Sequence, residues 1–361
     1  MNINELKDFY FNKRILVTGH TGFKGTWLCK VLSMFGANVY GYSLNPSTTP
    51  NIYNILKGNE WMNSIIGDIR DFERLNKCIK SVNPEYVFHL AAQPIVRESY
   101  KIPRDTYETN VMGTVNILES IRNHSGIKGF LNVTTDKVYE NNDKYDHPFC
   151  EDEKLDGFDP YSNSKSCSEL VTHSYKKSFF SEKGSPAIST ARAGNVIGGG
   201  DFSVDRIIPD CVRDTIKGNI ISIRNPFSIR PYQHVLEPIS VYLLIMMMQV
   251  KCSEYAGYYN VGPDDEDCVN TGRLAELFVQ HWGNQAKWES KKETNAPHEA
   301  SFLKLDCQKL KNTFGWNPVW HIDEAVRASV EWYKAWNNNE NCSLITEYQI
   351  AEFLSIFSEM V

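Results

Sequence analysis

A glycine-rich turn directly after a short apolar strand is the feature that most restricts how this chain can fold. Residues 15–17 are Ile-Leu-Val, and Gly19, Gly22 and Gly25 follow them at three-residue spacing before a helix-patterned run. Glycines permit a tight turn and let the pyrophosphate of a dinucleotide approach the N-terminus of the next helix. Unpaired N–H groups and the helix dipole favour negative charge there. The turn therefore predicts a dinucleotide site at the head of a βαβ unit.

Apolar runs alternate with helical patterns along the first 140 residues. The expected strands lie at 15–18, 38–42, 64–66, 86–91, 130–134 and 187–192, with a return strand at 258–261. This alternation predicts an α/β fold, a Rossmann-type doubly wound parallel sheet with its ligand at the carboxyl ends of the strands. We expect residues 1–190, with the return strand near 235–262, to form the dinucleotide-binding domain. Residues 191–234 and 263–361 are expected to form a smaller, mainly C-terminal substrate-binding lobe.

The composition indicates a protein that acts on a small molecule in the cytoplasm. Net charge is −6, and lysines and arginines are scattered, which argues against a nucleic-acid surface. The first 13 residues lack the apolar core of a signal peptide, and the longest apolar run, 241–248, is too short to cross a bilayer. Nine cysteines and nine histidines show no paired spacing, so we expect no metal.

Polar residues that suit acid–base chemistry occur at two further places. Tyr161 and Lys165 are four apart and share a helix face, so the ammonium can stabilise a phenolate. Thr135, Asp136 and Lys137 directly follow the strand at 130–134, at the sheet edge that faces the cofactor crevice. A polar turn of this kind is commonly only a local cap. The downstream tyrosine and lysine favour a catalytic role.

Together these motifs resemble the extended short-chain dehydrogenase/reductases, through GxxGxxG, the run 89–92, Asn110, and Tyr161 with Lys165. Stretches at 91–94, 135–137, 192–201 and 229–235 narrow the resemblance to nucleotide-sugar 4,6-dehydratases of the cytidine-linked branch. This resemblance implies NAD-dependent dehydration of a nucleotide-linked hexose, with CDP-glucose expected first and a 4-keto-6-deoxy sugar as product. It also implies a homodimer, formed through 111–120 and 161–174, that supplies deoxysugars for a cell-surface polysaccharide.

The resemblance further implies a role for each residue. Tyr161, helped by Lys165 and Thr135, takes the proton of the 4-hydroxyl; Asp136 is the acid and Lys137 the base of the elimination. A lysine acts as a base only if its pKa is lowered, so simple pairing of Lys137 with Asp136 or a phosphate stays open. Cofactor contacts are expected from Tyr161 and Lys165 and from Gly19, Thr21, Gly22, Phe23, Lys24, Gly25, Ser43, Asp68, Ile69, Leu90, Ala91, Ala92 and Asn110. Substrate contacts are expected from Gln93, Arg97, Asn195, Arg206, Arg230 and His298.

Three alternatives remain open at this point. Residues 42–45 lack the carboxylate that NAD sites place after the second strand, so NADP is an alternative cofactor, with Lys24 as a partner for its phosphate. A 4-epimerase or 4-ketoreductase would keep Tyr161 without needing an acid and base at 136–137. A non-catalytic dinucleotide-binding regulator is the third reading. Arg192 could equally be a buried ion-pair partner, and Trp332 is expected in the core.

Overall fold

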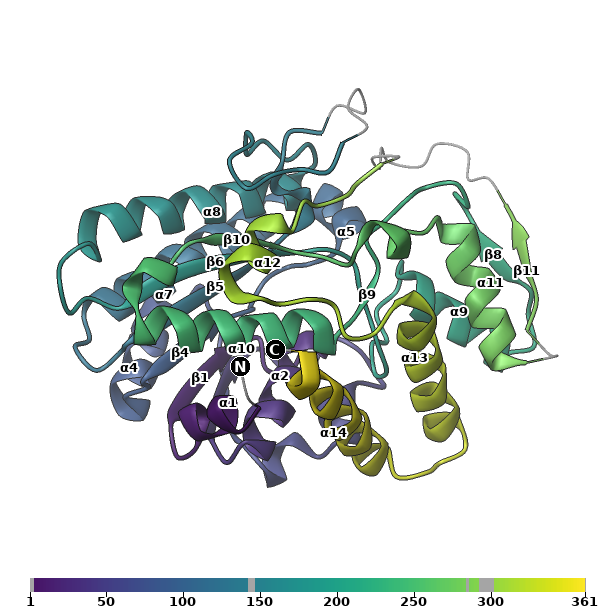
Figure 1. Ribbon diagram of the computed structural model, residues 1–361, viewed down its shortest axis with the longest axis horizontal. Helices are drawn as coiled ribbons and strands as arrows, with labels where there is room; N and C mark the ends of the chain where they lie inside the picture. Colours follow the sequence, from purple (N-terminus) through teal and green to yellow (C-terminus); the bar gives the residue numbers. More distant parts are fainter. Residues whose placement is uncertain (1–2, 142–146, 284–285, 292–301, 361) are drawn as a thin grey trace.

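The computed structural model describes residues 3–141, 147–283, 286–291 and 302–360. A seven-stranded parallel sheet lies at its centre, in the order β10-β6-β5-β4-β1-β2-β3 (Figure 1). The strands are β1 (Arg14–Thr18), β2 (Asn38–Ser43), β3 (Asn63–Ile66), β4 (Tyr86–His89), β5 (Gly129–Thr135), β6 (Ala187–Ala193) and β10 (Tyr258–Val261). The Rossmann-type prediction is confirmed, and the return strand pairs with β6.

One expected strand is shorter than its sequence suggested. β4 ends at His89, whereas the apolar run had indicated a strand to residue 91. The Leu90 N–H still donates to the Thr18 carbonyl at 3.1 Å, but the N–H groups of Leu90 and Ala91 also approach the Thr18 hydroxyl at 3.2 Å, because the chain there passes close over the glycine turn. A Cβ added to Gly19 would lie 2.8 Å from the Ala91 nitrogen. Packing against the turn therefore ends the strand.

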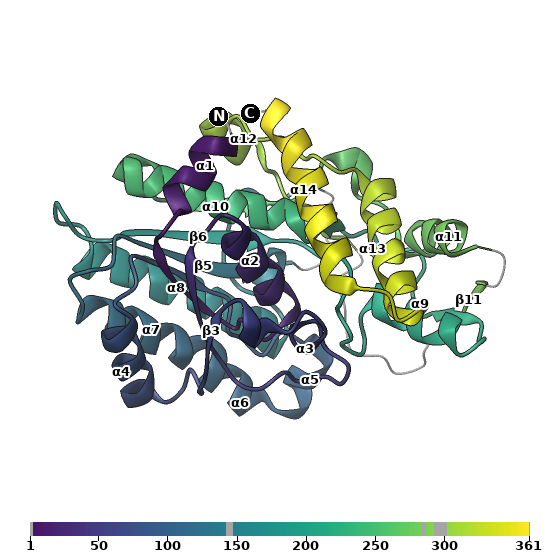
Figure 2. The same ribbon diagram turned by 90° about the horizontal axis from the view of Figure 1, so that it is seen from below.

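Helices cover both faces of the sheet (Figure 2). α1 (Ile3–Tyr10), α2 (Phe23–Met34) and α10 (Leu236–Lys251) lie on one side, and α4 (Phe72–Val82), α7 (Gly113–Arg122) and α8 (Pro160–Phe179) lie on the other. α10 is apolar around most of its circumference because the sheet and the C-terminal helices enclose it; Met246 and Met247 are fully buried. Short helical segments connect the sheet: α3 (Ile52–Ile55), α5 (Val96–Lys101), α6 (Pro103–Tyr107) and the π-helical turn Glu108–Met112, which runs directly into α7.

Most of the remaining elements gather at the carboxyl ends of the strands, on the right of Figure 1, whereas α12 (Gln308–Phe314) packs beside β10 and α14 (Cys342–Met360) lies near α1. Those at the strand ends are the parallel pairs β7 (Val196–Ile197) with β9 (Gln233–His234) and β8 (Ile221–Ile223) with β11 (Trp288–Ser290), and the helices α9 (Ile207–Ile216), α11 (Thr271–Trp282) and α13 (Ile322–Asn337). Trp332 of α13 is fully buried, as expected. α14 runs from α13 back to α1, so the last helix contacts the first.

A buried ion pair joins α8 to β6. Arg192 is 1% exposed and its Nη2 lies 3.0 Å from Glu169 Oε2. Burial by itself would raise the pKa of Glu169, but Arg192 and several hydrogen bonds lower it to about 2. Arg192 is therefore a structural residue, one of the two roles that its sequence position left open.

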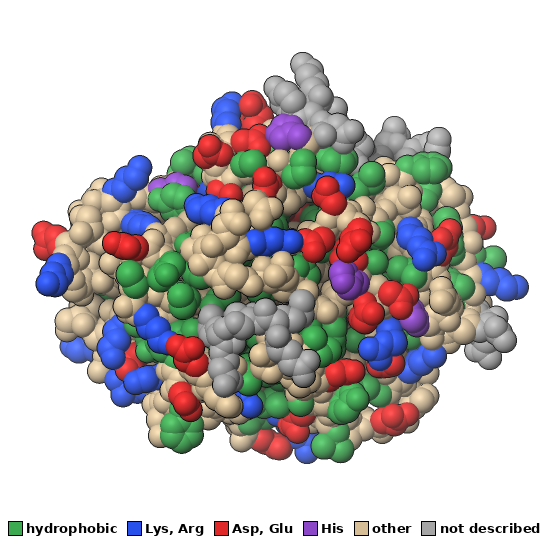
Figure 3. All heavy atoms as spheres, in the orientation of Figure 1, with side chains coloured by type: hydrophobic (Ala, Val, Ile, Leu, Met, Phe, Trp, Pro, Cys, Tyr) green, Lys and Arg blue, Asp and Glu red, His purple; other side chains and the backbone are tan. Residues whose placement is uncertain are grey.

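The surface charges in Figure 3 are interspersed in sign on the face shown. No helix in the described ranges is long and apolar enough to span a bilayer.

Candidate active site

The glycine turn connects β1 to the first turn of α2 and is closed by backbone contacts. Gly19 has φ +79°, which favours glycine, and a Cβ on Gly25 would lie 2.1 Å from the Gly19 oxygen. Gly22 precedes α2 without a side-chain cap, so the first N–H groups of the helix have no hydroxyl or carboxylate acceptor from a capping residue. Close backbone packing and an uncapped helix start fit the pyrophosphate of a dinucleotide.

A cavity of about 1040 Å³ opens beside this turn. The ends of the central strands form one wall, and β7, α9 and β8 form the opposite wall. Most of the expected site residues line it: Gly19, Thr21, Gly22, Phe23, Lys24, Gly25, Ser43, Asp68, Ile69, Leu90, Ala91, Ala92, Arg97, Thr135, Lys137, Tyr161, Lys165, Asn195, Arg206 and Arg230. The fold thus gathers residues more than 200 positions apart around one space.

Four expected residues are not among the lining groups: Gln93, Asn110, Asp136 and His298. The Gln93 amide donates to the Thr106 hydroxyl at 3.0 Å, and its oxygen accepts the Ile95 N–H at 2.6 Å. Asn110 accepts the Gln93 N–H at 2.8 Å, so both side chains hold the loop after β4 and do not face the cavity. His298 lies outside the described residues. A sugar contact by Gln93 therefore has no support in this geometry.

The end of the cavity near β2 carries two hydroxyl groups and, after β3, a carboxylate that is already paired. The Thr21 hydroxyl donates to the Leu44 oxygen at 2.8 Å and lies 3.0 Å from the Ser43 hydroxyl. Asp68, after β3, pairs with Arg70 at 2.7 Å, and this hydrogen bond holds its pKa below the usual range. Hydroxyl groups after β2 can bind a ribose, but they bring neither the carboxylate typical of NAD sites nor a cation for a phosphate.

Lys24 lies among the catalytic groups instead of at the ribose end. Its Nζ donates to the Tyr242 hydroxyl of α10 at 3.2 Å. Burial, and then the charges of Arg206 and Lys165, lower the pKa of Lys24 to about 7. The suggested contact between Lys24 and a ribose 2′-phosphate is therefore not supported, because the side chain points to the other end of the cavity.

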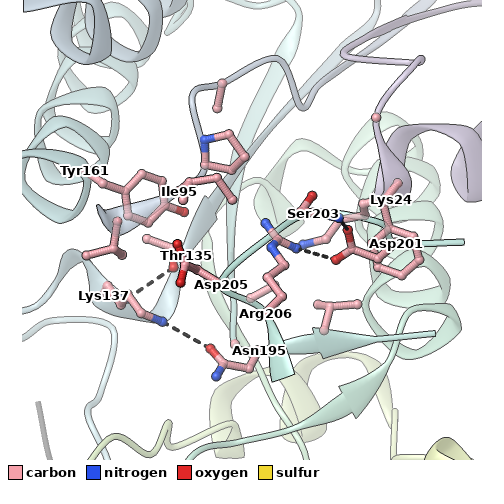
Figure 4. A pocket seen from close by; sticks show the side chains of 18 of the residues that line it. Lys24, Ile95, Thr135, Lys137, Tyr161, Asn195, Asp201, Ser203, Asp205 and Arg206 are labelled. Carbon is pink, nitrogen blue, oxygen red and sulfur yellow. Dashed lines mark hydrogen bonds and ion pairs between the residues drawn. The ribbon is translucent and has the colours of Figure 1, made fainter. Parts of the chain in front are cut away.

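The end of β5 presents a threonine, an aspartate and a lysine in one short 3₁₀ turn, Asp136–Val138. The Thr135 hydroxyl donates to Asp136 Oδ1 at 2.9 Å, and Lys137 Nζ lies 3.2 Å from the same oxygen. Lys137 Nζ also donates to the Asn195 amide oxygen at 3.1 Å (Figure 4). Asp136 is fully buried, and its Oδ2 has no partner within the described part of the chain. Lys137 thus lines the cavity, and the buried carboxylate of Asp136 contacts it from behind.

Tyr161 and Lys165 come from the first turns of α8. The helix begins there because Asp159 accepts the Ser162 N–H at 3.0 Å and proline occupies the first helical position. Burial raises the pKa of Tyr161 to about 12, against the opposing effect of a hydrogen bond with Thr135. Lys165 Nζ donates to the Val133 oxygen at 3.2 Å, and burial lowers its pKa to about 8. In this state the tyrosine is a neutral phenol held beside Thr135.

Several lining residues were missing from the sequence-based site, among them the charged pair Arg224 and Asp205. Arg224 follows β8, and its Nη1 lies 2.9 Å from Asp205 Oδ1. Asp205 also approaches Arg97 Nε, at 3.9 Å. No motif marks either residue, and their contact spans 19 positions of irregular chain. The only available signal was the density of arginines between 206 and 230.

A parallel sheet with a glycine turn at its head and a buried tyrosine and lysine beside the same cavity defines a dinucleotide-binding protein of the short-chain dehydrogenase/reductase type. A family model described as GDP-mannose 4,6-dehydratase matches residues 16–329. The chain belongs to this family, whose name identifies the group and not the substrate of each member.

Individual relatives agree with this placement. CDP-glucose 4,6-dehydratase of Salmonella typhimurium is 44% identical over 354 residues, covering 97% of this chain and 98% of the relative. A probable dTDP-glucose 4,6-dehydratase of Sinorhizobium fredii is 28% identical, covering 89% of this chain and 92% of the relative. The predicted kinship with nucleotide-sugar 4,6-dehydratases is therefore confirmed.

Solved structures agree on the fold. UDP-glucose 4-epimerase of Thermotoga maritima superposes with a TM-score of 0.78 at 23% identity, covering 89% of this chain and 99% of that one. dTDP-glucose 4,6-dehydratase of Bacillus anthracis, solved with NAD, gives a TM-score of 0.73 at 22% identity, covering 90% and 98%. Epimerases and dehydratases share this architecture, so the fold does not separate the two activities.

Proposed function

We propose that this chain catalyses the NAD-dependent 4,6-dehydration of CDP-glucose to CDP-4-keto-6-deoxyglucose. The observation that carries the proposal is the contact between Lys137, which lines the cavity with Tyr161 and the glycine turn, and Asp136, which is buried directly behind it. Dehydration needs an acid and a base in addition to the tyrosine, whereas epimerisation or ketone reduction at carbon 4 needs only the tyrosine. The extra pair therefore favours the dehydratase.

The residues at the glycine turn and at α8 supply the first step. When bound, the cofactor accepts a hydride from carbon 4 of the sugar and returns it to carbon 6. Gly19, Gly22 and Gly25 would hold its pyrophosphate, and Thr21 and Ser43 its ribose. Tyr161 takes the proton of the 4-hydroxyl, with Thr135 as hydrogen-bond partner and the buried Lys165 ammonium nearby in the cavity wall. The resulting ketone acidifies the hydrogen on carbon 5.

Asp136 and Lys137 then complete the elimination. The contact at 3.2 Å allows a proton to pass from Lys137 to Asp136. With that proton on Asp136, Lys137 removes the proton from carbon 5 while Asp136 protonates the departing 6-hydroxyl. The C5–H and C6–O bonds break, a C5=C6 double bond forms, and water leaves. The charged pair is restored by the same step.

The nucleotide assignment draws on the Salmonella relative, whose name specifies CDP-glucose. The NAD assignment draws on the cofactor named with the Bacillus anthracis structure and on the position of Lys24, whose ammonium donates to the Tyr242 hydroxyl. We include in the proposal a cytoplasmic location, a role in deoxysugar synthesis for a cell-surface polysaccharide such as lipopolysaccharide, and a homodimer. α7 and α8 would form the dimer contact; Met112, directly before α7, and Leu170 of α8 are about half exposed.

One incubation panel tests the activity. The protein, supplied with NAD, is mixed in parallel with CDP-, dTDP-, GDP- and UDP-glucose, and the product is treated with alkali to develop the absorbance of a 4-keto-6-deoxy sugar. We expect this absorbance with CDP-glucose first. Inverted sugar without the absorbance would establish an epimerase and refute the proposal. A preference for another nucleotide would refute only the substrate assignment.

The Lys137→Met variant tests the base. Because Tyr161 is untouched, oxidation at carbon 4 continues while elimination stops, so reduced cofactor should accumulate to about one equivalent and little product should form. Lys154→Met is the matched control, since Lys154 also pairs with carboxylates, Glu140 and Asp156, but on the exposed surface. A Lys137 variant that turns over at the rate of the control would show that the base lies elsewhere.

A further inference from the structure

A carboxylate inside the cavity occupies arginines that face the substrate space. Asp205 Oδ1 lies 2.9 Å from Arg224 Nη1 and 3.9 Å from Arg97 Nε, and all three residues line the cavity. These two arginines come from separate elements, α5 and the segment after β8. Asp205 has φ +60°, a left-handed backbone that is unusual for a residue other than glycine, asparagine or aspartate. The local backbone thus presents this carboxylate to both guanidinium groups.

The neighbouring Asp201 shows what a fixed carboxylate in this segment looks like. Asp201 is 4% exposed, accepts the Ser203 N–H at 3.0 Å and pairs with Arg206 at 3.1 Å (Figure 4). The Asp205 side chain is a third exposed, and among the described residues its carboxylate contacts are the two guanidinium groups. No backbone N–H in that part of the chain holds it. A backbone N–H therefore fixes Asp201 in its loop. The described contacts of the Asp205 carboxylate are with guanidinium groups, which can also bind another anion.

A diphosphate is the anion that suits these groups. Guanidinium forks bind carboxylate and phosphate oxygens with the same geometry, so the two compete for one site. Arg206 lines the same cavity and is close enough to Tyr161 for its charge to act on that phenol, and Arg224 directly follows β8. A nucleotide sugar whose hexose reaches Tyr161 must extend its diphosphate through this region. A neutral nucleoside has no group able to replace Asp205.

We propose that Asp205 is a built-in competitor for the substrate diphosphate: its carboxylate neutralises Arg97 and Arg224 until a nucleoside diphosphate displaces it. The inference rests on the proposed function for the identity of the nucleotide. What it claims is that a diphosphate replaces the Asp205 carboxylate on Arg97 and Arg224. Asp205 thereby weakens diphosphate binding and speeds product release. It is a positioning residue that acts through the two arginines and takes no part in the chemistry.

Binding of CDP and of cytidine by isothermal titration calorimetry tests this role. Asp205→Asn keeps a residue that tolerates left-handed backbone and removes the charge. We expect CDP to bind on the order of tenfold more tightly to this variant, because the diphosphate no longer has to break two partly exposed ion pairs. Cytidine should bind as it does to the unmodified protein. CDP affinity that is unchanged or lower would overturn the proposal, as would an equal gain for CDP and cytidine.

Two further variants separate competition from simple charge removal. Asp214→Asn removes one carboxylate from α9 outside the cavity lining and should leave CDP affinity within about twofold of the unmodified protein. In an Arg224→Met background, Asp205→Asn should lose most of its gain, since one arginine of the contested site is gone. An undiminished gain there would refute the mechanism. Asp205→Gly, which suits φ +60°, replaces the asparagine variant if that protein is unstable.

The same samples keep this proposal distinct from the enzymatic one. Turnover of CDP-glucose by the unmodified protein is measured alongside the titrations. A protein that binds CDP more tightly after Asp205→Asn, yet produces no 4-keto sugar, would support the competitor and refute the dehydratase. A protein that turns over CDP-glucose but shows no gain in CDP affinity would refute the competitor alone.

Discussion

Glu237 is a buried carboxyl group whose protonation should control the pH dependence of stability. It lies in the first turn of α10, is 1% exposed, and its Oε1 accepts the N–H groups of Val319 and Trp320 at 2.9 and 2.6 Å. Its Oε2 has no partner in the described ranges. Burial raises the pKa of Glu237 to about 8, although the two backbone hydrogen bonds act in the opposite direction. The native protein thus holds this proton at neutral pH.

The magnitude follows from proton linkage. Between about pH 5 and pH 8 the unfolded chain releases this proton while the folded chain keeps it, so the free energy of unfolding falls as pH rises, by at most about 1.4 kcal/mol per pH unit. Over that window the loss is roughly 4 kcal/mol. Glu237→Gln keeps the acceptor for both N–H groups and cannot ionise. We expect it to be close to neutral at pH 5 and several kcal/mol more stable than the unmodified protein at pH 8.

Urea denaturation followed by circular dichroism at pH 5, 6, 7 and 8 measures this difference. A hydrogen bond to Asp267 raises the pKa of His321, so stability from that pair is also lost as pH rises. The His321 contribution is present in both proteins and cancels in the difference between them, apart from the smaller charge effects of Asp267 and His321 on Glu237 itself. Glu276→Gln, at an exposed site on α11, is the control. A difference between Glu237→Gln and the unmodified protein that stays constant from pH 5 to pH 8 would refute the reasoning.

Three further predictions concern the site and its support. Tyr161→Phe should lower kcat by about 10² to 10⁴-fold, the usual contribution of a positioned base, with little change in CDP affinity; turnover at the normal rate would exclude the phenol as the base. Glu169→Gln should cost about 3–5 kcal/mol of unfolding free energy, because it leaves Arg192 as a buried charge without its counterion; a loss below about 1 kcal/mol in chemical denaturation would contradict this. Gly25→Ala places a Cβ 2.1 Å from the Gly19 oxygen and should weaken NAD binding at least about tenfold in a fluorescence titration, while an unchanged affinity would locate the pyrophosphate elsewhere.

The architecture was predictable because its signals are local. Strand β1, the glycine turn and α2 follow one another within 21 residues, and each requires particular residue types. Backbone geometry dictates glycine at φ +79°, and alternation of apolar runs dictates the parallel sheet. The end of β4 was missed because it depends on contact with Gly19, which the sequence of β4 does not contain.

The direction of individual side chains was less predictable. Lys24 follows the glycine turn, as a phosphate-binding lysine would, yet it points to Tyr242, which lies 218 positions away on α10. Gln93 lies in the loop beside the cavity, but its side-chain amide donates to the Thr106 hydroxyl and accepts the Ile95 N–H. The contact between Asp205 and Arg224 arises only when two irregular segments meet. Tertiary packing decides each of these orientations, and no local pattern records it.

The number of residues in the π-helical turn Glu108–Met112 determines which way the side chains before α7 face relative to those on α7. A π turn contains one residue more than the regular helix it interrupts, and Asn110 lies within this widened turn, where its amide also donates to the Ser164 hydroxyl of α8 at 2.9 Å. Removing a single residue there would restore α-helical spacing and rotate everything on one side of the deletion by about 100°. Asn110 would then leave the loop after β4 and α8 together. The one extra residue of the π-helical turn thus sets how the loop after β4, beside the expected cofactor site, is oriented relative to α8, which carries Tyr161.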